Sequence, residues 1–431
     1  MRAIKNEPSR RSFVAIGPAA GLALAMQALP AKSQDDRLRT DDRLQTNDRL
    51  RTNDLEARVD HAIDRTIADR RIVGTVVIVV RDGDVAYRRA AGYADREAGR
   101  PMHEDAIFRL ASLSKTIVSA TALALVDRGR LGLDDPVTKW LPGFQPRTKD
   151  GAVPVISIRQ LLTHTAGLSY GFYEPPDGSY HRAGVSDGLD QSGLDLDEEL
   201  HRIALAGLAA EPGTTWRYSI ATDVLGGVIA EAAGESLPDS VQRLVTAPLA
   251  MVDSGFSVSE SGRLAVPYAD GKPEPVRMAD PQLVPFRGLG VIRFSPSRAF
   301  DRASFPSGGA GMIGTAGDFV RFLEAVRTGG QSILTPSAVQ QMTTNQIGNL
   351  TVSNLPGWGF GFGCTSLKDQ VAAKSPQAPG TWAFTSAYGH SFFVDPERNL
   401  TVVAFTNTAL EGGFGAFVPA IRDAVYGRTQ E

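Results

Sequence analysis

The sequence predicts an α+β protein in which one sheet is built from both ends of the chain and a mostly helical region is inserted between them. Three observations predict this class. Residues 73–88 form a strand pattern, an Arg81-Asp82-Gly83-Asp84 turn and a second strand pattern. Residues 387–395 and 400–407 form two more strand patterns near the other end. The middle of the chain instead shows apolar residues at helical spacing, so we expect the strands of the two ends to share one sheet.

The individual helices follow from the same spacing rule. Leu55, Val59, Ile63 and Ile67 recur at helical intervals, which predicts a helix over residues 55–70. Further helices are expected over residues 114–127, 158–162, 198–208, 223–233, 237–244, 315–327 and 417–426. Loops rich in Pro and Gly, such as 143–154 and 265–306, separate them. The expected domain plan is an α/β domain over residues 55–108 and 306–431 with a mostly helical domain over 109–305.

The first 54 residues resemble an export signal and a linker. Arg10-Arg11 precedes an apolar stretch with small residues near Ala28 and Ala31, which predicts a Tat-type signal peptide over residues 1–33. Residues 34–54 repeat a polar pattern with too few apolar side chains to fold alone, which indicates a linker. The expected location is periplasmic or secreted, with no stable membrane insertion after signal removal. The alternative is a basic tail with a chance arginine pair.

Composition excludes several classes of function. The chain has 431 residues, 42% of them hydrophobic, and a formal net charge of −3, so no basic excess is available for nucleic acid. Cys364 is the single cysteine, which excludes an internal disulfide and a multi-cysteine metal cluster. The six histidines never occur at HExxH or HxxxH spacing. We therefore expect no metal, no organic cofactor and a small-molecule partner.

The sharpest chemical feature is Ser112-Leu113-Ser114-Lys115 at the head of an apolar helix. Side chains three residues apart share a helix face, which brings the Ser112 hydroxyl within reach of the Lys115 amine. Apolar surroundings disfavour the ammonium form and lower its pKa, so the amine can accept the serine proton. Lys115 is also the only lysine with a serine three residues before it. The pair predicts a nucleophile and its base, and the alternative is a lysine that faces solvent.

Tyr218, in Tyr218-Ser219-Ile220, is the second candidate for proton transfer. A buried cation beside a tyrosine favours the phenolate, which can act as a general base or carry a proton to the leaving group. Taken alone, Tyr218 is equally typical of a packed aromatic side chain. Its assignment as a catalytic group therefore depends on the presence of Ser112 and Lys115.

Ser169 is a rival nucleophile, because Gly167-Leu168-Ser169-Tyr170-Gly171 satisfies the G-x-S-x-G pattern of the nucleophile elbow. That elbow needs a strand before the serine and a helix after it. Here a predicted helix precedes the serine and a Pro-rich loop follows it, so Ser112 is preferred.

Taken together, the motifs resemble a known family. They are Arg-Leu-Ala-Ser-Leu-Ser-Lys-Thr at 109–116, Leu-Leu-Thr-His-Thr-Ala-Gly-Leu at 161–168, Tyr-Ser at 218–219, Pro-Ser-Gly-Gly-Ala-Gly-Met at 306–312 and Tyr-Gly-His-Ser-Phe-Phe-Val-Asp at 388–395. The set resembles the class C β-lactamase-type serine hydrolases, and within them the family VIII carboxylesterases. The resemblance covers about residues 55–428. It implies an antiparallel sheet flanked by helices, an inserted helical domain as in β-lactamases and DD-peptidases, and an acyl-enzyme on Ser112.

The resemblance also assigns roles to further residues. Lys115 and Tyr218 move protons, and the backbone N–H groups of Ser112 and Ala387 form the oxyanion hole. Side chains expected to contact substrate are Tyr170, Phe384, Trp382 and His390, with Trp358 and Phe360 as further aromatic candidates. For Trp382, Trp358, Phe360 and Phe384 a core position is equally expected, and for His390 a structural one.

Two departures from the family pattern bear on substrate. The second motif usually ends in Asn, where this chain has Ile220. The third is usually Lys-Thr-Gly or His-Thr-Gly on an edge strand, and the matching stretch is Phe384-Thr385-Ser386. An apolar Phe384 cannot pair with the carboxylate of a penicillin or a peptidoglycan stem. The sequence therefore predicts a serine carboxylesterase for short- to medium-chain esters. The alternatives are a β-lactamase, a D-amino-acid peptidase or an amidase using the same site, and a binding protein that captures peptidoglycan-like ligands without turnover.

Overall fold

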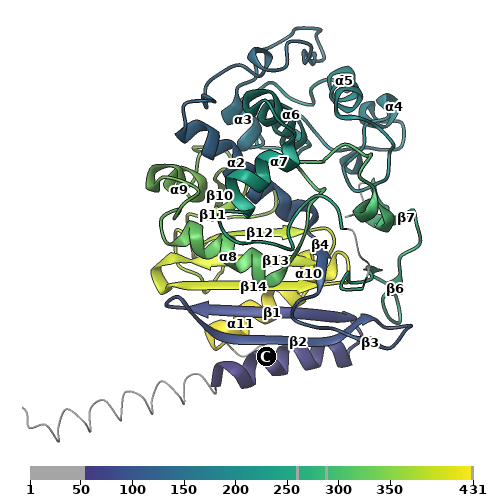
Figure 1. The fold of residues 1–431 in the computed structure, drawn as a ribbon, viewed down its shortest axis with the longest axis vertical. Coiled ribbons are helices and arrows are strands. Elements are labelled where there is room, and N and C mark those ends of the chain that lie inside the picture. Colours follow the sequence, from purple (N-terminus) through teal and green to yellow (C-terminus); the bar gives the residue numbers. More distant parts are fainter. Residues whose placement is uncertain (1–53, 259–261, 287–289, 429–431) are drawn as a thin grey trace, which may run out of the picture. The chain divides into compact units, whose positions relative to one another are not determined.

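An eight-stranded antiparallel sheet forms the centre of the computed structural model, which describes residues 54–258, 262–286 and 290–428 (Figure 1). Its strand order is β10 (Trp358–Phe360), β11 (Thr365–Leu367), β12 (Trp382–Ser386), β13 (His390–Asp395), β14 (Leu400–Thr406), β1 (Gly74–Arg81), β2 (Asp84–Asp95) and β3 (Arg100–Pro101). Strand β14 pairs with β1, so the two ends of the chain meet inside the sheet. This confirms the shared sheet that the sequence predicts.

The two faces of the sheet bury different apolar clusters, because successive strand residues point to opposite faces. Val77 and Val79 of β1 pack with a helix over residues 54–68 and with α11 (Phe417–Tyr426). Ile78 and Val80 belong to the larger core, which includes α2 (Ser114–Asp127) and α8 (Ala316–Arg327). The sheet is therefore covered by helices on both faces, as Figure 1 shows.

The region between β4 (Ile107–Arg109) and β9 (Ile313–Thr315), which pair with each other, is rich in helices. Its elements are α2, α3 (Ile158–Leu162), α4 (Ser179–Ala183), α5 (Leu196–Ala206), α6 (Ala221–Ala233) and α7 (Leu237–Val241). Helix α3 begins with a capping box between Ser157 and Gln160. After α8, a further helix α9 (Pro336–Thr343) leads to β10. The predicted helices are all present, with bounds that differ by a few residues.

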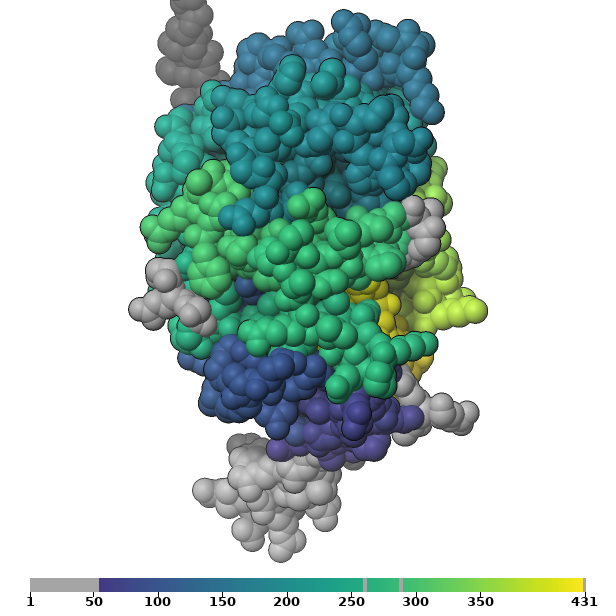
Figure 2. Space-filling model, turned by 90° about the vertical axis from the view of Figure 1, so that its right-hand side faces the viewer, coloured from purple at the N-terminus to yellow at the C-terminus, as the bar shows by residue number. Residues whose placement is uncertain are grey.

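The stretch predicted as a loop over residues 265–306 contains strands that the sequence did not indicate. Strands β5 (Tyr268–Ala269) and β6 (Val276–Arg277) form one antiparallel pair, and β7 (Gln282–Phe286) and β8 (Gly290–Phe294) form another. Pro and Gly broke the pattern that would have indicated them. In Figure 2 this segment, in green, lies across the face between the teal helical region and the purple first strands.

The predicted signal peptide and nearly all of the predicted linker lie outside the described residues. Within the described ranges, none of the helices combines the length and the apolar character that crossing a bilayer requires.

Candidate active site

Ser112 lies on a 3-10 turn, Ala111–Leu113, that leads directly into α2. The residue before it, Ala111, has a φ of 44°, a left-handed conformation that is rare for a residue with a Cβ and is found often at active sites. Two hydrogen bonds hold the preceding segment against the sheet. The Ser386 hydroxyl donates to the Leu110 carbonyl over 2.8 Å, and His390 Nε2 donates to the Arg109 carbonyl over 2.8 Å.

Lys115, the second residue of α2, is buried, with 1% of its surface exposed. Its Nζ donates a 2.7 Å hydrogen bond to the Gly309 carbonyl and lies 4.7 Å from the ring centre of Tyr218 and 5.3 Å from that of Tyr170. Burial lowers the pKa of Lys115 to about 7, against the opposing charges of Asp223 and Asp187. A neutral amine is therefore well populated near neutral pH.

Tyr218 donates a 2.7 Å hydrogen bond from its hydroxyl to Ser112 Oγ. Its ring lies against His164, Trp216 and Phe384. Desolvation raises the pKa of Tyr218 above its usual range, and the bond to Ser112 opposes the shift only in part. Burial therefore opposes the phenolate expected beside Lys115, and Tyr218 acts as a hydrogen-bond donor to Ser112.

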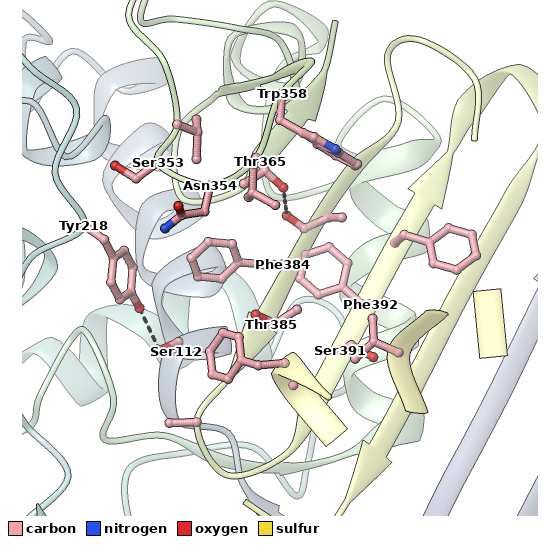
Figure 3. Close-up of a pocket in the computed structure, with 18 of the residues that line it drawn as sticks. Ser112, Tyr218, Ser353, Asn354, Trp358, Thr365, Phe384, Thr385, Ser391 and Phe392 are labelled. Carbon is pink, nitrogen blue, oxygen red and sulfur yellow. Dashed lines mark hydrogen bonds between the residues drawn. The ribbon is translucent and has the colours of Figure 1, made fainter. Parts of the chain in front are cut away.

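Ser112 and Tyr218 line a cavity of about 1110 Å³ (Figure 3). Tyr170, Phe384 and Trp358 line it as well. Ala387, just beyond β12, also faces this cavity, and among the described residues its backbone N–H has no partner. That free donor beside Ser112 is what an oxyanion hole needs.

Trp382 and His390 are not brought to the cavity. Trp382 is buried and packs edge-on against Phe392, with ring centres 5.6 Å apart. His390 is enclosed by the rings of Phe108 and Phe405, and its Nε2 is engaged by the Arg109 carbonyl. Both are core residues here, and so is Phe360, which lies on His164 and Trp216.

The strand that carries Phe384 also differs from the family expectation. Strand β12 is not at the edge of the sheet, because β11 and β10 extend it. However, β11 pairs only with Trp382 and Ala383. The segment from Phe384 onward pairs with β13 alone, so it forms a local edge beside Ser112.

Ser169, the rival nucleophile, is fully buried and does not line the cavity. Its Oγ accepts a 2.9 Å hydrogen bond from Arg217 Nε. Helix α3 precedes it and a 3-10 turn, Gly171–Tyr173, follows, so the strand–turn–helix setting of an elbow is missing around it.

The sequence did not predict a role for three groups around Lys115. Asp223 is buried inside the first turn of α6, and Ile220 holds the cap position of that helix. Asp187 lines the cavity and accepts a hydrogen bond from Gly171 N–H, and burial raises its pKa to about 7. Gly309 supplies the carbonyl that holds Lys115, and a Cβ on it would lie 2.4 Å from Asp223 Oδ2. Only the glycine-rich stretch 306–314 hinted at this close passage.

The described part of the chain groups no three His, Cys, Asp or Glu side chains in a way that could hold a metal ion. The groups that the structure brings together at the cavity are a serine hydroxyl, an amine and a phenol. These are the parts of a serine hydrolase in which an amine and a phenol handle the protons.

Comparison with known proteins agrees with this arrangement. The β-lactamase family profile matches residues 59–425. The chain therefore belongs to the β-lactamase family, in its branch of family VIII carboxylesterases.

Individual relatives make the likeness more specific. Esterase EstB of Burkholderia gladioli is 50% identical over 376 residues, which cover 87% of this chain and 96% of EstB. The solved structure of EstCE1, described as a hydrolase with promiscuous acyltransferase activity, has a TM-score of 0.86 and 44% identity, covering 88% of this chain and 100% of EstCE1. A D-amino acid amidase from Ochrobactrum anthropi shares the fold at a TM-score of 0.61 and 22% identity, and the match covers 87% of this chain and 99% of the amidase chain.

Proposed function

We propose that this carboxylesterase hydrolyses short- to medium-chain esters through an acyl-enzyme on Ser112. The Ser112 oxygen forms a bond to the ester carbonyl carbon while its proton passes to the neutral amine of Lys115. The bond from that carbon to the alkoxy oxygen then breaks, and the leaving alkoxide takes the proton of the Tyr218 hydroxyl. The Lys115 ammonium returns a proton to Tyr218.

Water completes the cycle by taking the place of the Ser112 hydroxyl as nucleophile. Its oxygen bonds to the acyl carbon as one of its protons passes to the Lys115 amine. The bond from that carbon to Ser112 Oγ then breaks, Oγ takes the proton of the Tyr218 hydroxyl, and the Lys115 ammonium returns a proton to Tyr218. The N–H groups of Ser112 and Ala387 stabilise the oxyanion in both halves.

The observation that carries the proposal is the 2.7 Å hydrogen bond between Tyr218 and Ser112 at the wall of the cavity. It joins the nucleophile to a proton donor at the point where a leaving group departs. The choice of neutral esters rests on Phe384, an aromatic side chain at the position where the family carries a cation. EstB, which is named as an esterase, supports the same choice.

The deciding experiment measures hydrolysis of p-nitrophenyl acetate, butyrate and octanoate beside a chromogenic cephalosporin. Ser112→Ala should abolish ester turnover, whereas Ser169→Ala should retain it, and brief reaction of the wild type should add one acyl mass to the Ser112 peptide. Cephalosporin turnover far above ester turnover would instead favour a β-lactamase. A stable penicillin adduct with no ester turnover would favour a binding protein.

Acyl transfer is a second candidate, favoured by the description of EstCE1 and by the aromatic lining around Ser112. An alcohol that enters such a cavity competes with water for the acyl-enzyme. Product analysis of vinyl acetate with an added alcohol tests it, since a new acetate ester must form at a rate that exceeds the uncatalysed one.

Export is also a proposal. The Arg10-Arg11 pair and the apolar stretch after it support a Tat-type signal. Fractionation of cells that express the full chain should find esterase outside the cytoplasm, and R10K/R11K should hold it inside. An unchanged distribution would contradict the proposal.

A further inference from the structure

The cavity at Ser112 continues past Phe384 onto the opposite face of the sheet. Its lining there consists of two cross-strand rows and the helix above them. One row is Ala383, Phe393 and Val402, the other is Thr385, Ser391 and Ala404, and the helical side is Val418, Pro419, Ile421 and Arg422 of α11. We call this part the sheet-face limb. Figure 3 shows Phe384 between Tyr218 and Ser391, where the two parts meet.

The register of the strands makes the floor of the limb one continuous surface. Residues paired across antiparallel strands point to the same face, so each row runs over β12, β13 and β14. Phe384, between the two rows on β12, points to the other face, toward Tyr218. The pairing of β11 with β12 stops at Ala383, so no strand continues the sheet beside Phe384 and Thr385. Residues on both faces of the sheet line the cavity at this local edge, so the cavity extends around the edge from one face to the other.

Small side chains keep the limb open. The row of Thr385, Ser391 and Ala404 lies under α11, whose Ile421 shares an apolar cluster with Ala404 and Phe393. Protein interiors are normally packed with few voids larger than a water molecule. Larger residues in this row would close the space, as they do elsewhere in the same cluster at Val77, Val79 and Tyr87.

The limb suits an uncharged chain. Among its residues named above, only Arg422 is charged, and its Nε is bound to Asp423 at 2.8 Å. The polar atoms of Thr365, at the entrance, are also engaged, since its hydroxyl donates to the Ala383 carbonyl over 2.7 Å. An aliphatic chain can bury its surface here without displacing an ion pair.

The position of Tyr218 decides which half of an ester enters. The alkoxy oxygen must lie at the Tyr218 hydroxyl to receive its proton, so the leaving group lies along Tyr218. The ring of Phe384 lies 6.0 Å from that of Tyr218 and flanks the passage to the limb. The alcohol half of the ester is therefore directed past Phe384.

We propose that the sheet-face limb is a binding subsite for the alcohol half of the substrate, and that it selects esters of unbranched aliphatic alcohols of about six to ten carbons. The assignment rests on the proposed ester hydrolysis at Ser112 and extends it to a substrate class. Burial of each methylene in such a limb raises kcat/KM by up to about 4-fold.

The test separates the two halves of the ester. Ethyl, butyl, hexyl and octyl acetate vary the alcohol, and p-nitrophenyl acetate, butyrate and hexanoate vary the acyl group. In the wild type, kcat/KM should rise at least about 10-fold from ethyl to octyl acetate. Ala404→Leu fills the floor of the limb and Val418→Phe fills it from α11. Either should remove most of that rise, so that kcat/KM for octyl acetate approaches kcat/KM for ethyl acetate.

The matched control is Ala420→Leu, the same enlargement on α11 outside the cavity lining, which should keep the wild-type dependence. Val418→Phe keeps the test valid if Ala404→Leu does not fold. A flat alcohol series in the wild type overturns the proposal, and so does a loss confined to the acyl series. Ethyl acetate turnover that survives Ser112→Ala would instead overturn the proposed function.

Discussion

The hydroxyl of Tyr218 donates a 2.7 Å hydrogen bond to Ser112 Oγ across 106 residues of chain. Neither residue is bonded to Lys115, whose Nζ donates to the Gly309 carbonyl and faces the ring of Tyr218. In the resting site the Ser112 nucleophile is therefore hydrogen-bonded to its proton donor, Tyr218, whereas the base, Lys115, has no hydrogen bond to either of them. This arrangement makes the roles of the phenol and the amine separable by substitution.

Tyr218→Phe removes the hydroxyl and retains the ring contacts with Phe384 and His164. Loss of a general acid lowers kcat by about 10²- to 10⁴-fold. KM for p-nitrophenyl butyrate should change only a few-fold, because the aromatic wall remains. Steady-state kinetics measure both, and a kcat near that of the wild type would show that Tyr218 only packs.

The pH dependence of the reaction should report Lys115. Its pKa is about 7, so the neutral amine that accepts the Ser112 proton forms as pH rises through that value. We expect kcat/KM for a neutral ester to fall about tenfold per pH unit well below 7 and to level off above it. A profile that falls as pH rises through 7 would contradict a lysine base.

Asp223 offers a sharper version of that test. Its negative charge raises the pKa of Lys115, which burial alone would lower further. Asp223→Asn should therefore move the acid limb of the kcat/KM profile to lower pH. An acid limb that stays in place would mean that another group titrates. Thermal unfolding of the variant, measured alongside, separates this effect from a loss of fold.

Strands β1, β2, β13 and β14 and the longer helices were predicted from the sequence because each rests on local periodicity, whereas β10, β11, α4 and α9 were not predicted. Helix α2 has the predicted bounds, since eight of the ten residues from Ile117 to Val126 are apolar. The sequence also indicated that Ser112 and Lys115 lie one turn apart at the start of this helix, but it did not indicate that Lys115 Nζ is bonded to the Gly309 carbonyl and Ser112 Oγ to Tyr218. The strands β5 to β8 were not predicted either, since they are two to five residues long and lie among Pro and Gly.

The sequence did not predict which aromatic residues of β12 line the cavity and which lie in the core. Trp382 and Phe384 share one face of β12, yet Trp382 is in the core and Phe384 lines the cavity. The difference arises because β11 covers only the first two residues of β12, and that depends on pairing with a strand distant along the chain. The position of Asp187 was not predictable either. Its carboxylate lines the cavity and accepts a hydrogen bond from Gly171 N–H in the turn after Tyr170, and no sequence motif indicates this contact.

Phe384 is expected to set the preference between esters and β-lactams. Phe384→Lys places an ammonium beside Tyr218, where it can pair with the carboxylate of a cephalosporin. A charged hydrogen bond of this kind favours cephalosporin acylation over p-nitrophenyl butyrate hydrolysis by about 10-fold or more. Phe384→Leu, which removes the ring and adds no charge, is the control. Equal ratios in both variants would show that the charge at this position has no effect.

His390 is expected to hold the sheet to the segment before Ser112. Burial lowers its pKa to about 4, so the folded chain keeps it neutral with Nε2 donating to the Arg109 carbonyl. His390→Phe removes that bond and should lower the free energy of unfolding at pH 7.5 by about 1–3 kcal/mol, with kcat changed less than by Tyr218→Phe.

The sign of the pH effect distinguishes this role from catalysis. In the unfolded chain His390 is protonated as the pH falls below about 6.5, whereas in the folded chain it stays neutral until the pH falls to about 4. Between these two values protonation favours the unfolded state, so the stability due to His390 is lost as the pH falls from about 6.5 to about 4. The stability gap between wild type and His390→Phe, from denaturant unfolding, should therefore narrow from pH 6.5 to 4. A gap that stays constant while kcat falls by orders of magnitude would place His390 in the chemistry instead.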